Sequence, residues 1–306
     1  MDLKQLEYFR HVAELGSFTR AAAFLSVVQP ALSRQVRQLE VELGQNLFDR
    51  NGRGVVLTEA GTRLLEHTRG ILMQVGRARQ ELEDQRNGDS GHFVLGLPPS
   101  LGRSVTVPLV KAFGRLLPNA SLATVEGLSA YMLEWLNVGR VDCALVYNAP
   151  ASPSIDLQPL LDDQLFLIGP LADKSRRKAR KSIALAELAD YPLIIPSRPH
   201  SIRMSVENAL AGVDVKIKVA HEIECIPAVI DLVRQGHGYG VLPLNAVKSS
   251  PWADAVLIKP IVAPILTSSL SIAISAQRPK SPLMRKSIDV IRDIVRQEIR
   301  FAEITT

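Results

Sequence analysis

The stretch that most constrains this chain is residues 19–48, where two short helical patterns follow one another across a tight turn. The first pattern contains three alanines at 21–23, whose small side chains allow a second helix to approach closely. The second begins at Gln29-Pro30, because proline is well tolerated at a first helical turn, and ends before Gly44. Its apolar residues recur every three or four positions and predict one buried face. They are Leu32, Val36, Leu39 and Leu43.

The other face of the second helical pattern carries mostly polar and basic side chains. Five residues there are candidates for contacts with double-stranded DNA: Gln29, Pro30, Ser33, Arg34 and Arg37. Gln, Ser and Arg side chains read base edges or contact phosphates, and the first turns of such a helix enter the major groove. The segment therefore predicts a helix-turn-helix, although an ordinary amphipathic helix pair shows part of the same pattern.

Residues 48–57 read as strand, turn and strand. Asn51-Gly52 is a strong hairpin-turn signal, and Arg50 and Arg53 flank it. A hairpin with two arginines after a DNA-reading helix is typical of a wing that contacts phosphate or the minor groove. The alternative is an ordinary exposed hairpin.

The sequence predicts one long helix over residues 58–87. Thr58 is its expected cap, and no proline interrupts it. At 1.5 Å per residue it would run roughly 43 Å. An apolar stripe on so long and otherwise polar a helix favours contact with another helix, hence dimerisation, over packing within the chain. The residues of this stripe are Leu64, Ile71, Val75 and Leu82.

From residue 92 onward, strand and helix patterns alternate, which predicts α/β domains with largely parallel sheets. The length of this part favours two lobes. The expected strands are 92–97, 122–126, 141–147, 165–168, 193–196, 216–221, 239–242 and 270–275. The expected helices are 105–117, 129–138, 202–210, 226–235 and 282–300.

Several classes of protein are excluded. The two cysteines cannot form a disulfide framework or a four-thiolate zinc site. No secretory signal and no apolar run of about 20 residues is present, so we expect a cytoplasmic protein without membrane contact. The six histidines show no metal-ligand spacing, and Ser100 has no evident His and Asp partners. We therefore expect neither an enzyme nor a cofactor.

The net charge of +5 is not the signature of DNA binding, because residues 1–65 contain eight basic and seven acidic residues. The basic run at 174–181 contributes to the excess and is interpreted as a solvated loop or helix start, with a functional anion contact as the alternative. Placement of arginines on the second helical pattern and at the hairpin is what favours DNA as a partner.

The chain closely resembles the LysR-type transcriptional regulators. The match in the first 61 residues includes Gly16-Ser17-Phe18, Gln29-Pro30-Ala31-Leu32-Ser33, Leu43-Gly44 and Ala60-Gly61. Later motifs continue it, and they resemble the nitrogen assimilation control branch most. They are Pro98-Pro99-Ser100, Glu126-Gly127-Leu128-Ser129, Leu133-Glu134-Trp135-Leu136 and Gly240-Val241-Leu242-Pro243. Val28 departs from the family, which often has Ser or Thr there, so a side-chain phosphate contact does not carry over.

The resemblance implies an all-α N-terminus joined to an α/β part. It implies a winged helix-turn-helix domain (1–57), a long linker helix for dimerisation (58–87), and a two-lobed, periplasmic-binding-protein-like effector domain (88–306). Lobe one would comprise about 92–163 and 264–306, and lobe two about 164–263. The implied partners are double-stranded DNA, a small-molecule effector, further copies in a homodimer or homotetramer, and RNA polymerase.

Ligands of α/β sheets bind beyond the carboxyl ends of strands, often at helix N-termini. Three loops meet this description and predict a cleft for a small, anionic effector, although each taken singly also reads as a loop cap. The candidate residues are Pro99, Ser100, Leu101, Ser129, Ser197, Arg198 and His200. The predicted function is a sequence-specific DNA-binding regulator controlled by this effector. The alternative is a cytoplasmic solute-binding protein with an N-terminal dimerisation domain.

Overall fold

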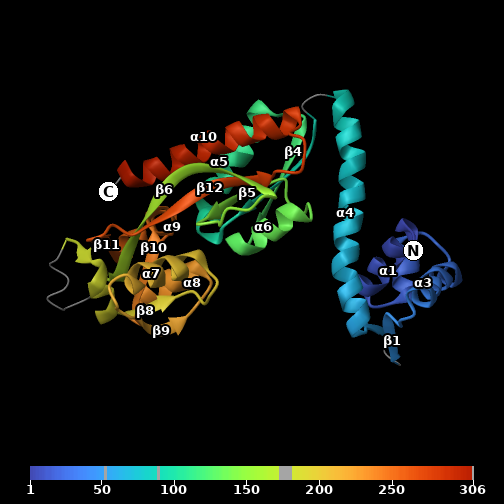
Figure 1. The fold of residues 1–306 in the computed structure, drawn as a ribbon, viewed down its shortest axis with the longest axis horizontal. Coiled ribbons are helices and arrows are strands. Elements are labelled where there is room, and N and C mark those ends of the chain that lie inside the picture. The colour runs from blue at the N-terminus through green and yellow to red at the C-terminus, as the bar shows by residue number, and fades with distance from the viewer. Residues whose placement is uncertain (52–53, 88–89, 172–180, 305–306) are drawn as a thin grey trace. The chain divides into compact units, whose positions relative to one another are not determined.

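A computed structural model describes residues 1–51, 54–87, 90–171 and 181–304. The chain forms two compact units, the first of residues 1–83 and 138–140 and the second of residues 84–137 and 141–306. Figure 1 shows the elements of both along the chain.

Three helices build the core of the first unit. They are α1 (Leu3–Leu15), α2 (Phe18–Phe24) and α3 (Gln29–Leu43). Asp2 and Ser17 cap the first two by accepting backbone N–H groups, and Gly44 ends α3 in the left-handed conformation at φ 65°. The apolar positions Leu32, Val36 and Leu39 are fully buried, as predicted.

Leu43, which the sequence predicted to be buried, is instead partly exposed, and so is Phe24. Leu43 is 39 % exposed because it lies in the last turn, beyond the reach of the core. Phe24 is 67 % exposed and packs its ring against His11 instead. The two small residues Ala21 and Ala22, in contrast, are buried where α2 meets its neighbours.

The first unit also contains a hairpin and a long helix. Strands β1 (Phe48–Asn51) and β2 (Gly54–Leu57) pair antiparallel. Helix α4 (Glu59–Asn87) follows, and its cap is Thr58, whose Oγ1 accepts the N–H of Gly61 at 3.0 Å. A long helix capped by Thr58 is therefore confirmed.

Lobe one of the second unit is built on a mixed sheet. Strands β4 (Ala120–Glu126), β3 (Gly91–Leu97) and β5 (Cys143–Tyr147) run parallel. Beside them, β12 (Thr267–Ser275) runs antiparallel to β5. Helices α5 (Pro99–Leu116) and α10 (Pro282–Ile304) contribute to one core cluster, whereas α6 (Ser129–Asn137) contributes to another, as their separation in Figure 1 also shows.

The long strand β6 (Ile155–Pro170) continues from lobe one into lobe two. Residues 155–164 pair with β12, whereas residues 165–168 pair with β10 (Tyr239–Pro243). Both pairings are antiparallel, so the crossing between the lobes lies within one continuous strand near Asp163.

Lobe two arranges its helices around a second set of strands. Strands β8 (Pro192–Ile195) and β9 (Lys218–Glu222) run parallel to β10, and β11 (Val256–Val262) pairs with β6 and with β7 (Ile183–Ala184). The helices are η2 (Leu185–Asp190), α7 (Ser201–Ala211), α8 (Ile226–Arg234), α9 (Leu244–Lys248) and η3 (Ala253–Ala255). Among the described residues, no helix is long and apolar enough to cross a membrane.

Candidate nucleic-acid interface and effector site

The exposed face of α3 forms a concave surface with a volume of 710 Å³. All five residues that the sequence singled out on this helix line it, so the structure gathers them on one surface. The lining comprises Gln29, Pro30, Ser33, Arg34, Arg37, Glu40, Asn46 and Phe48. Pro30, Arg34 and Arg37 are exposed, whereas Ser33 is half-buried.

Glu40 and Asn46 fix the geometry of this surface through hydrogen bonds. Neither residue was predicted from the sequence to take part in it. The buried Glu40 accepts backbone N–H groups of Leu47 at 2.9 Å and Phe48 at 3.4 Å, which fixes the chain as it enters β1. Arg37 Nη1 lies 3.5 Å from Glu40 Oε2 and 3.5 Å from Asn46 Oδ1. The guanidinium of Arg37 is thereby oriented along the exposed face of α3.

Val28 is the N-cap of α3 and provides no side-chain hydrogen bond. Gln29 is thus the first residue of the helix, and Pro30 lies in its first turn, where a missing N–H costs nothing. Pro30 has no N–H, and the N–H groups of Ala31 and Leu32 donate to the carbonyl of Val28 at 3.1 and 3.3 Å. In this first turn the N–H of Gln29 is the one that points out of the helix end toward an incoming phosphate.

The predicted wing is present as the β1–β2 hairpin. In its register, Arg50 lies opposite Val55 and Asn51 opposite Gly54. Arg53 falls outside the described residues, so its role stays a prediction. The hydroxyl of Thr58 donates to the carbonyl of Asn46 at 2.7 Å, which ties the base of the hairpin to the end of α3.

The four residues of the predicted dimerisation stripe have different environments on α4. Leu64 packs against the core of the first unit, together with its neighbours Leu65 and Leu72. Ile71 lines a shallow groove beside the start of α1, and Val75 lines a larger groove between α1 and α4. Leu82 is 67 % exposed. Exposed apolar side chains are thus found on α4 at Ile71, near its middle, and at Leu82, in its C-terminal half.

On lobe one, Ser100 and Ser129 converge on Tyr147, the last residue of β5. Ser129 Oγ accepts the backbone N–H of Tyr147 at 2.9 Å, and the Ser100 hydroxyl hydrogen-bonds to the phenol of Tyr147. That phenol donates to the buried carboxylate of Asp163 at 2.6 Å. Burial, followed by the charge of Asp163, raises the pKa of Tyr147 well above its usual range, so the phenol remains a donor.

Two amide side chains link this group of residues to lobe two. Asn148 Nδ2 donates to Ser205 Oγ of α7 at 2.8 Å, and Asn245 Nδ2 of α9 donates to the carbonyl of Ser100 at 3.4 Å. The carbonyl oxygen Oδ1 of Asn245 is buried and has no hydrogen-bond partner. The junction between the lobes is therefore polar, and it lies beside the N-terminus of the long helix α5.

The three lobe-two candidates lie in the loop before α7. Ser197 Oγ donates to Glu224 Oε1 at 2.6 Å, and Arg198 Nε donates to Glu207 Oε2 at 2.8 Å. The buried ring of His200 caps α7, because its Nδ1 accepts the N–H of Ile202 at 3.2 Å. Burial lowers the pKa of His200, so the ring is neutral near pH 7. Neither Arg198 nor His200 offers an uncompensated positive charge.

The remaining candidates at the start of α5 differ from one another. Pro99 is half-buried at the first helical position. The side chain of Leu101 is fully buried in the core of lobe one, and its N–H donates to the carbonyl of Pro98 at 2.9 Å. Leu101 therefore supports the loop from within.

Sequence reasoning missed Tyr147, Asn148, Asp163, Ser205 and Asn245. The sequence contained a signal for the first two. Tyr147 and Asn148 lie at the end of an apolar strand, as Glu126 and Ser129 do at the end of an earlier strand. The other three depend on contacts between distant segments.

Comparison with known families decides which family the chain belongs to. Residues 3–62 match the bacterial regulatory helix-turn-helix family of the lysR type, and residues 86–296 match the LysR substrate-binding domain. The chain belongs to the LysR family of transcriptional regulators. It is thus a DNA-binding transcriptional regulator with an effector-binding domain, and not an enzyme, as the sequence predicted.

Individual relatives agree with this assignment. The nitrogen assimilation regulatory protein nac of Klebsiella aerogenes is 32 % identical over 296 residues, which cover 96 % of this chain and 95 % of that protein. The hydrogen peroxide-inducible genes activator of Dickeya chrysanthemi is 27 % identical, covering 98 % of this chain and 96 % of that one. Full-length CbnR complexed with its target DNA has a TM-score of 0.77 at 24 % identity, covering 96 % of this chain and 100 % of that one. The likeness to the nac branch is weak at this level of identity.

Proposed function

We propose that this LysR-type regulator reads double-stranded DNA with α3 and the β1–β2 hairpin, under control of a small polar effector bound between the lobes. The observation that carries the DNA-reading half is the concave surface lined by Gln29, Ser33, Arg34 and Arg37. Its side chains combine base-reading amide and hydroxyl groups with phosphate-binding guanidinium groups. Arg50 and Arg53, in the sequence of the hairpin, add two basic residues to the proposed interface.

The proposed effector site uses the hydroxyl and amide groups at the junction of the lobes. Ser100 and Ser129 on lobe one, together with Ser197 and His200 on lobe two, supply donors and acceptors. An anionic group of the effector is attracted by the partial positive charge at the N-terminus of the 18-residue helix α5, which begins with Pro99 and Ser100. The charge of Arg198 is offset by Glu207, so it contributes little to such attraction.

We further propose that the protein acts in the cytoplasm as a homodimer or homotetramer that contacts RNA polymerase. Exposed apolar side chains on the C-terminal half of α4, such as Leu82, support self-association. Two recognition helices held by paired α4 helices would then read an interrupted palindrome. Effector binding changes this geometry only through different affinities for the two lobe arrangements.

The test begins with operators selected from random duplexes by the purified full-length protein. Arg34→Ala should weaken binding to the selected site about 5- to 100-fold, which corresponds to roughly 1–3 kcal/mol for a lost base or phosphate contact. Arg115→Ala, a change at an exposed residue of α5 in lobe one, is the matched control and should leave binding unchanged. Equal affinities of the Arg34 variant and the wild type at physiological salt would remove α3 from the DNA interface.

A further inference from the structure

Val28 is an exposed apolar residue at the N-terminal tip of α3. Its side chain is 70 % exposed, although valine is among the residue types most often buried. It is the N-cap of α3, its backbone is extended, and its side chain makes no capping hydrogen bond. The N-cap position favours side chains with an oxygen that accepts an N–H of the first turn, and valine has none. The side chain of Val28 therefore does not stabilise the helix as a cap.

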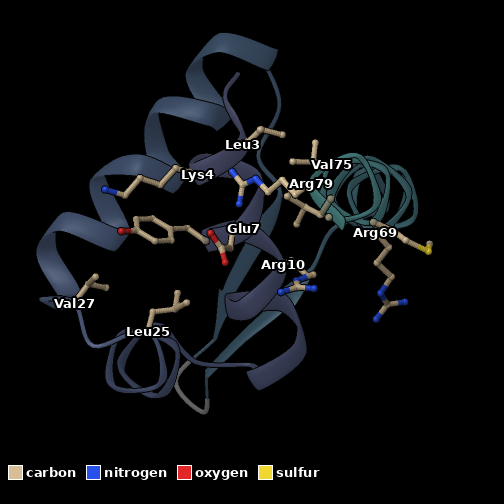
Figure 2. A pocket seen from close by; sticks show the side chains of 13 residues that line it. Leu3, Lys4, Glu7, Arg10, Leu25, Val27, Arg69, Val75 and Arg79 are labelled. Atoms are coloured by element: carbon tan, nitrogen blue, oxygen red, sulfur yellow. The ribbon is translucent and has the colours of Figure 1, made fainter. Parts of the chain in front are cut away.

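The turn before α3 fixes the direction of this side chain. Val27 lies at one end of the groove between α1 and α4 (Figure 2) and packs against the core cluster that contains Leu32. Val27 and Leu32 occupy the two positions of a hydrophobic staple, which sets the angle at which the chain enters a helix. The carbonyl of Val28 accepts the N–H groups of Ala31 and Leu32. The backbone is thus held on both sides of Val28, and its side chain stays outside the core.

Val28 lies directly beside the surface that we assign to DNA. The next two residues of the chain, Gln29 and Pro30, line the concave surface of α3. The N-terminal residues of a recognition helix are the ones that meet base edges in the major groove, and the N-cap precedes them. A single exposed valine on an ordinary surface needs no explanation. At this position, however, the side chain loses its water when the helix enters the groove.

The major groove offers one apolar group to such a side chain. The edges of guanine, cytosine and adenine present hydrogen-bond donors and acceptors, whereas thymine adds its C5-methyl group. Against a phosphate or a base nitrogen, valine would displace water without replacing its hydrogen bonds, which is costly. The branched Cβ of valine also restricts rotation about χ1, so little side-chain entropy is lost on contact. The methyl group of a thymine is therefore the partner that fits Val28.

We propose that Val28 is a specificity-determining residue whose side chain contacts the C5-methyl group of a thymine in each half of the operator. This inference rests on the proposed function, in which α3 reads DNA. In this arrangement the N–H of Gln29 meets a phosphate at the edge of the groove, and Val28 lies against the methyl group of a nearby thymine. The contact selects thymine over cytosine through apolar area, without a hydrogen bond.

The experiment replaces thymine by uracil, one position at a time, in the operator selected by the full-length protein. Uracil lacks the C5-methyl group and keeps every hydrogen-bonding group of thymine. Binding by the wild type should fall about three- to fivefold at one position of each half-site, which is the effect of one methyl group removed from water. Val28→Ala should weaken binding to the thymine operator by a similar factor, and it should bind the uracil duplex at that position equally well.

Val41→Ala is the matched control. Val41 is 69 % exposed on the same helix, but it lies near the C-terminal end, away from the tip. This variant should bind the operator as the wild type does and should show the same loss on the uracil duplex. Because both valines are exposed, neither change should alter the stability of the fold, which circular dichroism checks.

The combination of results decides the role of Val28. A uracil effect that is present in the wild type and in Val41→Ala but absent in Val28→Ala supports the inference. An equal effect in all three proteins assigns the methyl group to another residue, and no effect at any thymine means that Val28 contacts no methyl group; both overturn it. Unchanged operator binding by Val28→Ala with weaker transcription in a reconstituted reaction assigns the side chain to a protein partner and also overturns it.

Arg34→Ala, measured on the same duplexes, tests the proposed function separately. Weaker binding by this variant together with a flat uracil series rejects the role of Val28 alone. Binding equal to that of the wild type removes α3 from the DNA interface and rejects the proposed function as well.

Discussion

The phenol of Tyr147 donates a 2.6 Å hydrogen bond to the buried carboxylate of Asp163, joining the end of β5 to the point where β6 passes between the lobes. Removing one partner of such a buried pair leaves the other group without its bond. Tyr147→Phe should therefore lower the free energy of unfolding by about 1–3 kcal/mol.

Urea denaturation of the purified protein at neutral pH measures this loss. Tyr131→Phe removes a hydroxyl from a tyrosine that is 46 % exposed, and it should change stability by less than about 0.5 kcal/mol. Equal midpoints for the two variants would mean that the Tyr147–Asp163 bond adds no stability.

Gly61 in the first turn of α4 allows the helix to approach the backbone at Leu47. A Cβ at this position would lie 2.1 Å from the carbonyl oxygen of Leu47, and backbone gives way poorly. Gly61→Ala should therefore destabilise the first unit by about 1–3 kcal/mol despite the better helix propensity of alanine. Gly70→Ala, on the same helix with nothing within 4 Å, should instead be neutral or stabilise by up to about 1 kcal/mol. Thermal unfolding followed by circular dichroism separates the two, and a stabilised Gly61 variant would contradict the close approach.

The sequence predicted elements whose apolar pattern is strong and local. Helix α3 begins at Gln29 and ends at Gly44 as expected, because its period and both its end signals lie within sixteen residues. The paired strands of the hairpin and strand β10 were predicted for the same reason.

Elements with weak local signals were missed or shortened. The first half of β6 was not predicted, since residues 155–164 contain Pro159 and several polar residues. Strand β11 contains Pro260, and α9 is only five residues long. Both are stabilised by pairing or packing with distant segments, which periodicity does not reveal.

Like the fold, the candidate site could be predicted only in part from the sequence. Ser100 and Ser129 follow strands directly, so their positions could be predicted from the order of elements. Asn245, in contrast, contacts Ser100 across 145 residues of sequence, and Asn148 contacts Ser205 across 57. These contacts depend on how the two lobes pack against each other, which the pattern of a single sequence does not reveal.

The two cysteines should differ sharply in reactivity. Cys225, before α8, is exposed, whereas Cys143 is fully buried in β5, where burial raises the pKa of its thiol. A thiol-specific reagent should therefore modify one thiol per native chain, and both thiols only after unfolding in guanidinium. Cys225→Ser should abolish the native reaction, and rapid modification of two native thiols would contradict the packing around Cys143.

This difference also bears on regulation. One of the relatives is a hydrogen peroxide-inducible activator, but a buried thiol with a raised pKa is a poor site for peroxide, since the thiolate is the reactive form. The Cys143→Ala variant and the wild type should therefore respond to peroxide in the same way, as measured by operator binding before and after treatment.

His200 should make the stability of the effector domain depend on pH. Burial lowers its pKa below the ordinary 6.5, with the charge of Glu224 acting in the opposite sense. As pH falls below 6.5, the unfolded chain takes up a proton at this position while the folded chain resists it. The stability due to the neutral ring is thus complete above pH 6.5 and is lost as the pH falls towards the folded-state pKa. His200→Asn keeps an acceptor for the N–H of Ile202 but does not titrate, so its urea midpoint should fall less steeply on acidification. His221→Asn, on the exposed strand β9, should follow the wild type, and parallel curves for all three proteins would show that His200 has no part in the acid response.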